Sequence, residues 1–171
     1  MISASPGMTS HGIRARFLQS RSSHWSGSAG AIYPLMSKLT ERGFLAVEET
    51  RRGSRARRAY TITPAGTKEL RRWLGPPLAP WIASVTFDPL RTRMAFMGVA
   101  SAPKQEVMLE EAIALLETEL IELRRERKEL TGQDQFWEEM AAEGCLAITQ
   151  ARLRWVRRTL ESLRQKWRDE A

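Results

Sequence analysis

The residues best suited to bind a charged partner are five arginines within one short segment: Arg51, Arg52, Arg55, Arg57 and Arg58. Guanidinium groups bind phosphate oxygens through charge-assisted hydrogen bonds, and arginine also enters narrow minor grooves of DNA. Like charges held this close repel one another unless a polyanion neutralises them. A merely solvated basic loop is the alternative. The cluster therefore favours a surface that contacts a nucleic-acid backbone.

A second candidate for phosphate binding is the helix expected to start at Ser28. Residues 28–31 are small, so their backbone can approach another surface, and the free N–H groups of a helix start favour an anion. A plain helix cap without a ligand explains the same residues, and both interpretations stay open. The residues that we expect to contact DNA are Ser28, Gly30, Tyr33 and Lys38 on this helix, with Arg51, Arg52, Arg55 and Arg57.

The positive charge is confined to one half of the chain. Residues 1–74 hold 13 Lys and Arg against 4 Asp and Glu, whereas residues 75–171 hold 14 against 16. This asymmetry indicates a polyanionic partner for the N-terminal half, with a basic surface kept for solubility as the alternative.

Residues for catalysis or metal binding form no recognisable pattern. Cys145 is the single cysteine, which excludes an internal disulfide and a cysteine-based zinc site, and we expect its thiol to be buried. His11 and His24 have no cysteine or carboxylate cluster beside them. We expect no enzyme, no metal and no cofactor. The apolar runs are too short to span a bilayer, and we expect a cytoplasmic protein.

The elements that position the candidate residues follow from hydrophobic periodicity. Residues 1–10 are expected to be irregular, and helices are expected over residues 12–21 and 28–42. Ser28 is the expected N-cap of the second helix, and Gly43 its left-handed stop. The inward residues of that helix should be Ile32, Leu35, Met36 and Leu39.

Beyond Gly43 the period changes to that of strands. Residues 44–47 and 59–62 are expected to pair as a hairpin, with the basic segment between them as its tip. Thr63 should cap a helix that starts at Pro64 and ends near Leu74. Helix, helix, hairpin and helix is the order of a winged helix-turn-helix. A proline-rich connector, residues 75–103, should follow, with a short helix over residues 88–97.

Residues 104–171 are expected to form two long helices with coiled-coil-like seams. A second apolar line on the last helix, including Trp137, Ile148 and Trp155, leaves apolar surface that one hairpin cannot bury. This pattern predicts a homodimer; a monomer that folds the hairpin back on the winged helix is the alternative. The seam residues expected at the dimer contact are Leu109, Ile113, Leu116, Leu120, Leu153, Val156, Leu160 and Leu163.

The N-terminal residues resemble the PadR family of transcription regulators. The resemblance covers roughly residues 7–74 and rests on residues 26–35 (SGSAGAIYPL), 41–45 (ERGFL) and 57–66 (RRAYTITPAG), with His11-Gly12. It implies a dimeric repressor whose second N-terminal helix enters the major groove and whose wings grip the flanking backbone. It also implies C-terminal dimerisation helices, sometimes with a site for phenolic or drug-like effectors.

One departure from the family concerns the residues before His11. Members normally begin with a full apolar helix there, and residues 1–10 are too short and too polar to supply it. Either the chain starts downstream of a longer form, or the domain lacks a packing helix. In the second case Phe17, Ile32 and Leu39 would lose cover.

The sequence thus predicts a mainly α chain with a small β-hairpin wing. A winged helix-turn-helix domain (residues 1–74, first helix truncated) precedes the connector (75–103) and the two-helix dimerisation region (104–171). The predicted function is repression through operator DNA; the alternative is a dimeric protein-interaction scaffold that does not bind DNA. Trp81, Trp137 and Trp155 either line a pocket for a small aromatic effector or fill core space.

Overall fold

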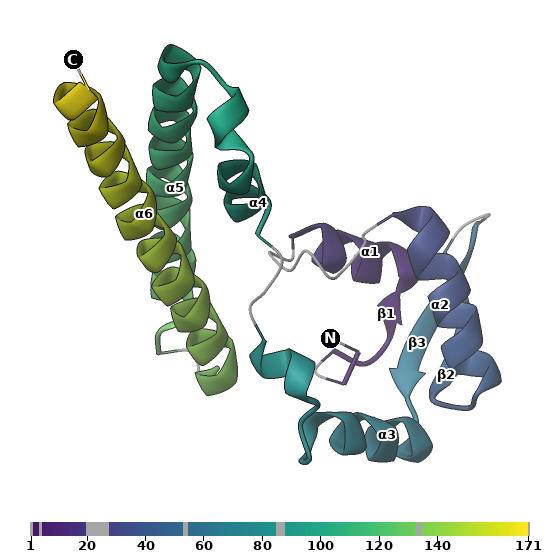
Figure 1. The fold of residues 1–171 in the computed structure, drawn as a ribbon. Coiled ribbons are helices and arrows are strands. Elements are labelled where there is room, and N and C mark those ends of the chain that lie inside the picture. The colour runs from purple at the N-terminus through teal and green to yellow at the C-terminus, as the bar shows by residue number, and fades with distance from the viewer. Residues whose placement is uncertain are drawn as a thin grey trace. The chain divides into compact units, whose positions relative to one another are not determined.

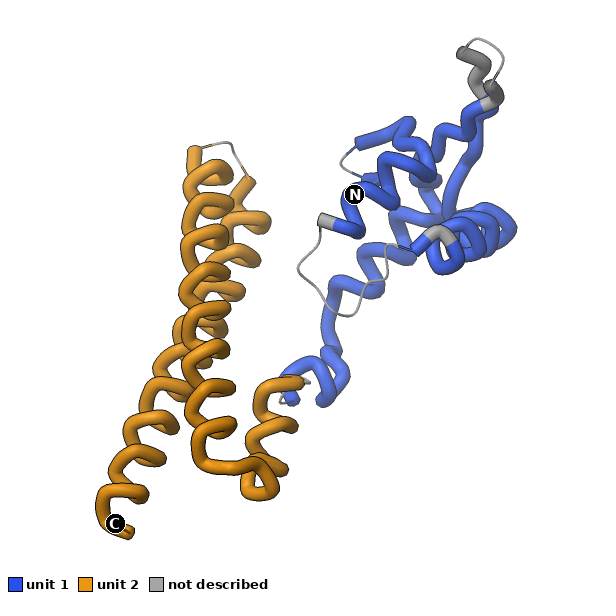
Figure 2. Tube along the Cα trace, turned by 90° about the horizontal axis from the view of Figure 1, so that it is seen from above, with its two compact units in different colours: residues 1–84 blue, residues 85–171 orange. Residues whose placement is uncertain are grey.

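The chain divides into two compact units. The computed structural model describes residues 2–3, 5–19, 28–52, 55–84, 88–132 and 135–170. Unit 1 is Met1–Ser84 and unit 2 is Val85–Ala171 (Figure 2). The division falls inside the proline-rich segment, so residues 75–84 belong to the first unit and the short helix that follows belongs to the second. Each unit is described by itself.

Unit 1 contains the helices and hairpin expected of a winged helix (Figure 1). Its elements are β1 (Met8–Thr9), α1 (Ser10–Gln19), α2 (Ala29–Glu41), β2 (Leu45–Arg52), β3 (Arg55–Ile62), α3 (Pro64–Leu74) and the 3-10 turn η1 (Pro80–Ala83).

The sheet differs from the expected hairpin in two ways. It has three antiparallel strands in the order β1-β3-β2, because Met8 pairs with Tyr60 and Thr9 with Ala59. The expectation that residues 1–10 are irregular was therefore wrong for this pair. The hairpin strands also run much further than predicted, since Arg52 still pairs with Arg55. The basic segment is thus mostly strand, and a run of polar residues hides that from a reading based on apolar alternation.

The ends of α2 follow the predicted local chemistry. The Ser28 hydroxyl accepts a hydrogen bond from the Ala31 N–H at 3.2 Å, as an N-cap does. Gly43 has a φ of 71°, the left-handed conformation in which glycine avoids the cost of a Cβ. Pro34 lies in the second turn, where the helix tolerates it. Local rules therefore fix the helix that carries most of the candidate contacts.

The start of α3 is held tightly against the end of the hairpin. Thr63 accepts a hydrogen bond from the Gly66 N–H at 3.0 Å and donates to the Gly43 carbonyl at 2.7 Å, which confirms the predicted cap. A Cβ placed on Gly66 would lie 2.1 Å from the Phe44 carbonyl oxygen. Only glycine permits this approach of helix to backbone.

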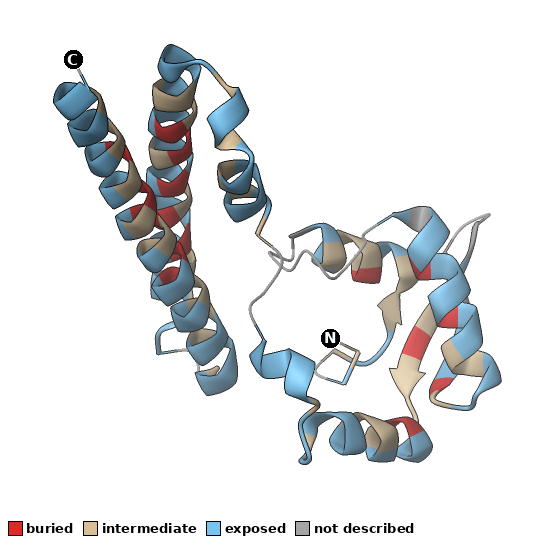
Figure 3. Ribbon diagram, viewed as in Figure 1, coloured by how far each residue is buried: buried red, intermediate tan, exposed pale blue. Residues whose placement is uncertain are grey.

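The core of unit 1 is small and lies between the helices and the sheet. Its buried residues are Ile13, Ile32, Met36, Leu45 and Tyr60, with Ile2, Met8, Phe17 and Leu39 packed against them (Figure 3). The expected loss of cover over Ile32 does not occur, because Ile2 and Met8 pack against this core. The short N-terminal segment thus supplies part of the cover.

Unit 2 is a long antiparallel pair of helices with a short helix beside it. Its elements are α4 (Pro89–Ala95), the 3-10 turn η2 (Met97–Val99), α5 (Ala102–Leu130) and α6 (Phe136–Glu170). Asp88 caps α4, and Leu90 and Met94 pack against the core between α5 and α6. The chain as a whole is mainly helical with one small antiparallel sheet, as the sequence predicted.

The heptad seams of α5 and α6 face each other within one chain. Leu109, Leu116, Leu120, Leu153, Val156 and Leu160 are buried there, and Ile113 and Leu163 pack against them. For the six buried residues the assignment to a contact with a second copy was therefore wrong, whereas for the half-buried Ile113 and Leu163 it stays a prediction. Periodicity identifies a seam but does not say whether its partner is the next helix or another molecule. Cys145 is half-buried beside this core rather than fully buried.

Candidate nucleic-acid interface

One side of α2 is polar and open. Ser28, Gly30, Tyr33 and Lys38 are all exposed, and a Cβ built on Gly30 would meet no atom within 4 Å. Ile32, Met36 and Leu39 turn to the core on the other side, as predicted. Leu35 was expected there too, but it remains 40% exposed. The buried stripe of α2 is narrower than its apolar pattern, and the open side is correspondingly wider.

A hollow lies where α1, α2 and β3 meet. We call it the junction hollow, and it is lined by Thr9, Ser10, His11, Tyr33, Ser37, Arg57, Arg58 and Tyr60. Tyr33 of the open side of α2 and Arg57 of the basic strand therefore border the same depression. This proximity joins two of the regions that the sequence singled out.

The electrostatics around the junction hollow are dominated by donors of hydrogen bonds. None of its lining residues is acidic. One lining residue, Arg58, pairs with a carboxylate outside the hollow: Glu49 accepts a hydrogen bond from Arg58 Nε at 3.2 Å on the exposed wing. An exposed pair of this kind contributes little to stability and is easily exchanged for another anion.

The remaining wing arginines can be placed only by their backbone. Arg51 and Arg52 lie near the end of β2, and Arg55 begins β3. Their side chains lie outside the described residues, as do Gly53, Ser54 and His24. The Arg57 side chain is exposed.

The carboxyl of Glu69 on α3 has an altered pKa. Hydrogen bonding to Arg72 lowers the pKa of Glu69 below its ordinary value of 4.5, and the charges of Arg72 and Arg42 act in the same direction. The same pairing raises the pKa of Arg72. Both residues belong to one helix and are three residues apart, so we interpret the ion pair as a contact that stabilises α3.

The tryptophans expected at an effector pocket are dispersed. Trp81 is exposed on η1 in unit 1, whereas Trp137 and Trp155 belong to α6 in unit 2. Trp137 is 78% exposed, and Trp155 packs against the seam core. A helix rises about 1.5 Å per residue, so these two lie roughly 27 Å apart along α6. One copy of α6 does not bring them to one small pocket.

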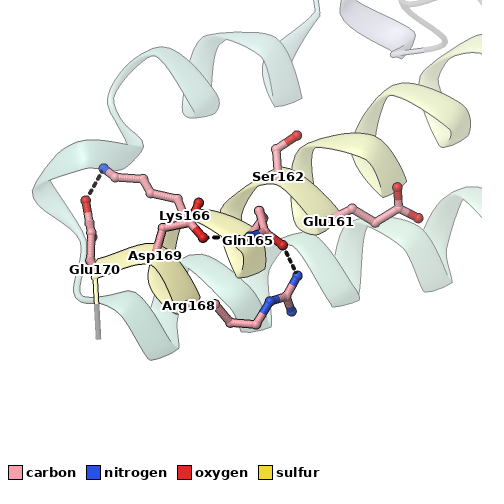
Figure 4. A pocket seen from close by; sticks show the side chains of 7 residues that line it. All are labelled: Glu161, Ser162, Gln165, Lys166, Arg168, Asp169 and Glu170. Atoms are coloured by element: carbon pink, nitrogen blue, oxygen red, sulfur yellow. Dashed lines mark hydrogen bonds and ion pairs between the residues drawn. The ribbon is translucent and has the colours of Figure 1, made fainter.

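A shallow hollow near the end of α6 offers no comparable chemistry. Figure 4 shows it lined by polar residues that bond to one another along the helix, such as Lys166 with Glu170 at 3.6 Å. These are ordinary contacts of a solvated helix end. Among the residues that the structure describes, no group of three or more His, Cys, Asp or Glu could hold a metal ion. No helix in that part of the chain combines the length and apolarity needed to cross a membrane.

Sequence reasoning named Tyr33 and Arg57 as DNA contacts but none of the other six residues that line the junction hollow: Thr9, Ser10, His11, Ser37, Arg58 and Tyr60. Arg58 was noted only as part of the basic segment, and Tyr60 only as a strand residue. The signal that could have found them is the strand β1, because its pairing with β3 brings the start of α1 beside Tyr60. Two residues are too short a strand for periodicity to detect.

The comparisons with known proteins agree with the fold. Residues 8–72 match the sequence profile of the transcriptional regulator PadR-like family. A curated relative, the negative transcriptional regulator PadR of Bacillus subtilis (strain 168), is 32% identical over 68 residues. That alignment covers 39% of this chain and 37% of the relative's length, so the sequence likeness concerns well under half of either protein.

Solved structures extend the likeness to the whole fold. Bacillus subtilis PadR in complex with operator DNA superposes with a TM-score of 0.78 at 20% identity, covering 92% of this chain and 91% of that one. The same protein in complex with p-coumaric acid gives a TM-score of 0.72 at 19% identity, covering 92% and 90%. At these identities the structures establish a shared fold.

Proposed function

We propose that this chain, whose residues 8–72 match the profile of the transcriptional regulator PadR-like family, is a repressor that binds operator DNA as a homodimer. The family regulates transcription and is not a family of enzymes. The proposal assigns α2 to the major groove and the long hairpin of β2 and β3 to the flanking backbone. Its DNA contacts would come from Ser28, Gly30, Tyr33 and Lys38 and from Arg51, Arg52, Arg55 and Arg57.

The observation that carries this proposal is the continuity of the open side of α2 with the basic strand. Tyr33 and Arg57 line one hollow, and no acidic residue lines it with them. A phosphate backbone that runs past the start of α2 would meet both. The small residues Ser28 and Gly30 let that helix approach a groove closely, although they offer little side chain to read bases. We therefore expect DNA shape and half-site spacing to supply much of the specificity.

Support for the homodimer comes from the apolar line on α6 that α5 does not cover. Trp137 is 78% exposed and Ile148 is 59% exposed, with Ala141 and Ala151 exposed in register between and beyond them. Large apolar side chains aligned on one helix face are typical of a surface that another molecule buries. We assign this line to the contact between two copies.

An aromatic effector is a further part of the proposal. The fold is shared with a regulator solved in complex with p-coumaric acid. Trp81, Trp137 and Trp155 offer flat apolar faces that could stack on such a ring. Because Trp137 and Trp155 lie far apart on α6, a pocket with both would need residues of two copies.

Binding to duplex DNA at several salt concentrations tests the proposal. The probe is the duplex upstream of the chain's own gene, with a scrambled duplex of equal length as the control. We expect affinity to fall steeply with salt, because each neutralised phosphate contributes a log–log slope of about −0.9. Absent or salt-insensitive binding would instead support the protein-interaction scaffold.

The dimer contact is tested separately by Ile148→Glu. A charge in the α6 line should convert the dimer to a monomer in analytical ultracentrifugation. The matched control is Leu115→Glu, because Leu115 is a comparably exposed apolar residue on α5. A loss of dimer in the control alone would move the contact from α6 to α5.

A further inference from the structure

We propose that the junction hollow seats a single phosphate group of the DNA backbone, with the Tyr60 hydroxyl as one of its donors. This inference rests on the proposed function, because the phosphate is one of the bound operator. It adds Ser10, His11, Ser37, Arg58 and Tyr60 to the surface, none of which the assigned groove and wing contacts include. It also predicts one particular phosphate per half-site on which affinity depends.

Tyr60 is the first argument for a ligand. It is only 6% exposed and belongs to the core of unit 1, yet it lines the hollow. No hydrogen bond to its hydroxyl occurs among the described residues, and that oxygen is not among the buried polar atoms without a partner, so it reaches solvent although the ring is buried. A phenol donates readily to an anionic oxygen. The hydroxyl is thus a donor that the folded unit itself leaves unused.

The start of α1 is the second argument. Backbone N–H groups in the first turn of a helix have no partner within the helix. Thr9 Oγ1 accepts from the Gly12 N–H at 3.2 Å, which satisfies one of them. Ser10 and His11 precede Gly12 and line the hollow. The hollow therefore lies at the positive end of a helix of 10 residues.

The composition of the lining is the third argument, and it selects the class of ligand. Hydroxyl, imidazole and guanidinium groups line the hollow beside the rings of Tyr33 and Tyr60, and no carboxylate lines it. A cation would find no negatively charged ligand there. A tetrahedral anion would meet donors on several sides. The charged neighbour on the wing is Glu49, and its pairing with Arg58 is exposed.

The experiment uses the whole chain and the upstream duplex once its footprint is known. Tyr60→Phe removes only the hydroxyl, and we expect binding to weaken by about tenfold or more for each phosphate site, the usual scale for one hydrogen bond to a charged group. Because the lost group is neutral, the salt dependence should stay as in the parent. Arg58→Gln should instead lower the salt slope by about one per chain.

A duplex series with one uncharged methylphosphonate at each successive position identifies the seated phosphate. The parent should lose affinity at each phosphate that it contacts. At one position per half-site the uncharged group should also abolish the difference in affinity between the parent and Tyr60→Phe. The proposal is overturned if Tyr60→Phe binds like the parent, or if its deficit is the same at every position. Failure of the parent to bind any duplex would refute the proposed function itself, which separates the two results.

Two further variants keep the test decisive. Thr118→Val removes a hydroxyl from the exposed side of α5 and should leave DNA binding unchanged. Should Tyr60→Phe fold poorly in thermal melts, His11→Ala carries the test, since His11 is exposed and lies outside the core. His11→Ala should show the same position-dependent loss of DNA affinity. A loss that is equal at every position would again overturn the proposed phosphate site.

Discussion

The two units use arginine in opposite ways. In unit 2 arginines bridge separate elements, as Arg164 does with Glu106 at 2.7 Å and Glu110 at 2.6 Å, and Arg127 with Glu143 at 3.0 Å. The first of these pairs raises the pKa of Arg164. Bases and acids are nearly equal in number there, so the charges can satisfy one another.

In unit 1 the acidic residues are too few to pair with all of the basic ones. Four acidic residues cannot neutralise thirteen basic ones, and the pairs Arg58 with Glu49 and Arg72 with Glu69 lie on exposed surface. The long hairpin of β2 and β3 holds five of the thirteen basic residues. The comparison teaches that one unit uses positive charge to join its own helices, whereas the other carries a positive surplus that the proposed function assigns to DNA.

The largest effect on DNA binding should come from removing positive charge from the hairpin. Arg51, Arg52, Arg55 and Arg57 changed together to Ala should weaken duplex binding by roughly 100-fold or more and flatten its salt dependence. Fluorescence anisotropy at several salt concentrations measures both. The matched control changes four exposed arginines of unit 2, namely Arg124, Arg125, Arg154 and Arg158. If both variants lost equal affinity, the contrast between the units would be wrong.

The next largest effect is expected on stability, at the apolar seam between α5 and α6. Leu123 is 1% exposed between α5 and α6, and Leu123→Ala should lower the free energy of unfolding by about 2–5 kcal/mol. Leu115→Ala, on the exposed side of the same helix, should change it by less than about 0.5 kcal/mol. Urea unfolding at one fixed protein concentration measures both. Equal losses would show that α5 buries both of its sides.

A smaller effect is expected where unit 2 begins. Asp88 Oδ1 accepts from the Leu90 N–H at 2.9 Å and from Arg152 Nη2 at 2.8 Å, so it caps α4 and holds that helix on α6. Asp88→Ala should cost about 1–3 kcal/mol of unfolding free energy, partly because Arg152 loses its partner. Asp88→Asn keeps the cap and should cost less. Glu117→Gln, at an exposed pair, should cost under about 1 kcal/mol.

The smallest effect concerns Glu69 and pH. Its pKa is lowered in the folded chain, so the stabilisation is present above 4.5 and is lost as pH falls through the lower folded value. Carbon-detected NMR titration should give a pKa below 4.5 in the parent and a value closer to 4.5 in Arg72→Gln. An unchanged value in the variant would show that Arg72 is not the cause.

Local chemistry was predictable from sequence, and long-range pairing was not. Ser28, Gly43 and Thr63 act as expected, because a cap or a stop depends on residues within one turn. The pairing of Met8 with Tyr60 depends on residues 52 positions apart and only two residues long, so no local pattern reveals it. The length of β2 and β3 was missed because their outer halves are polar.

The candidate site shows the same division. The exposure of Tyr33 and Lys38 could be predicted from the helical repeat of α2. The exposure of Leu35 could not, because it depends on how much of the apolar face of α2 the rest of the unit covers. The seam of α5 and α6 was found, but its partner was misassigned, because a heptad pattern is the same within a chain and between chains. The junction hollow needs three elements to meet and could not be derived from any one of them.

The close approach at Gly66 has a consequence for genetics. Any larger residue there would collide with the Phe44 carbonyl and displace the helix that follows the hairpin, although Gly66 does not line the junction hollow. A screen for alleles that relieve repression should therefore recover Gly66→Ala beside the wing arginines. The two kinds of allele would differ in cells: the glycine allele would reduce the amount of protein, and the arginine alleles would leave normal amounts of an inactive one.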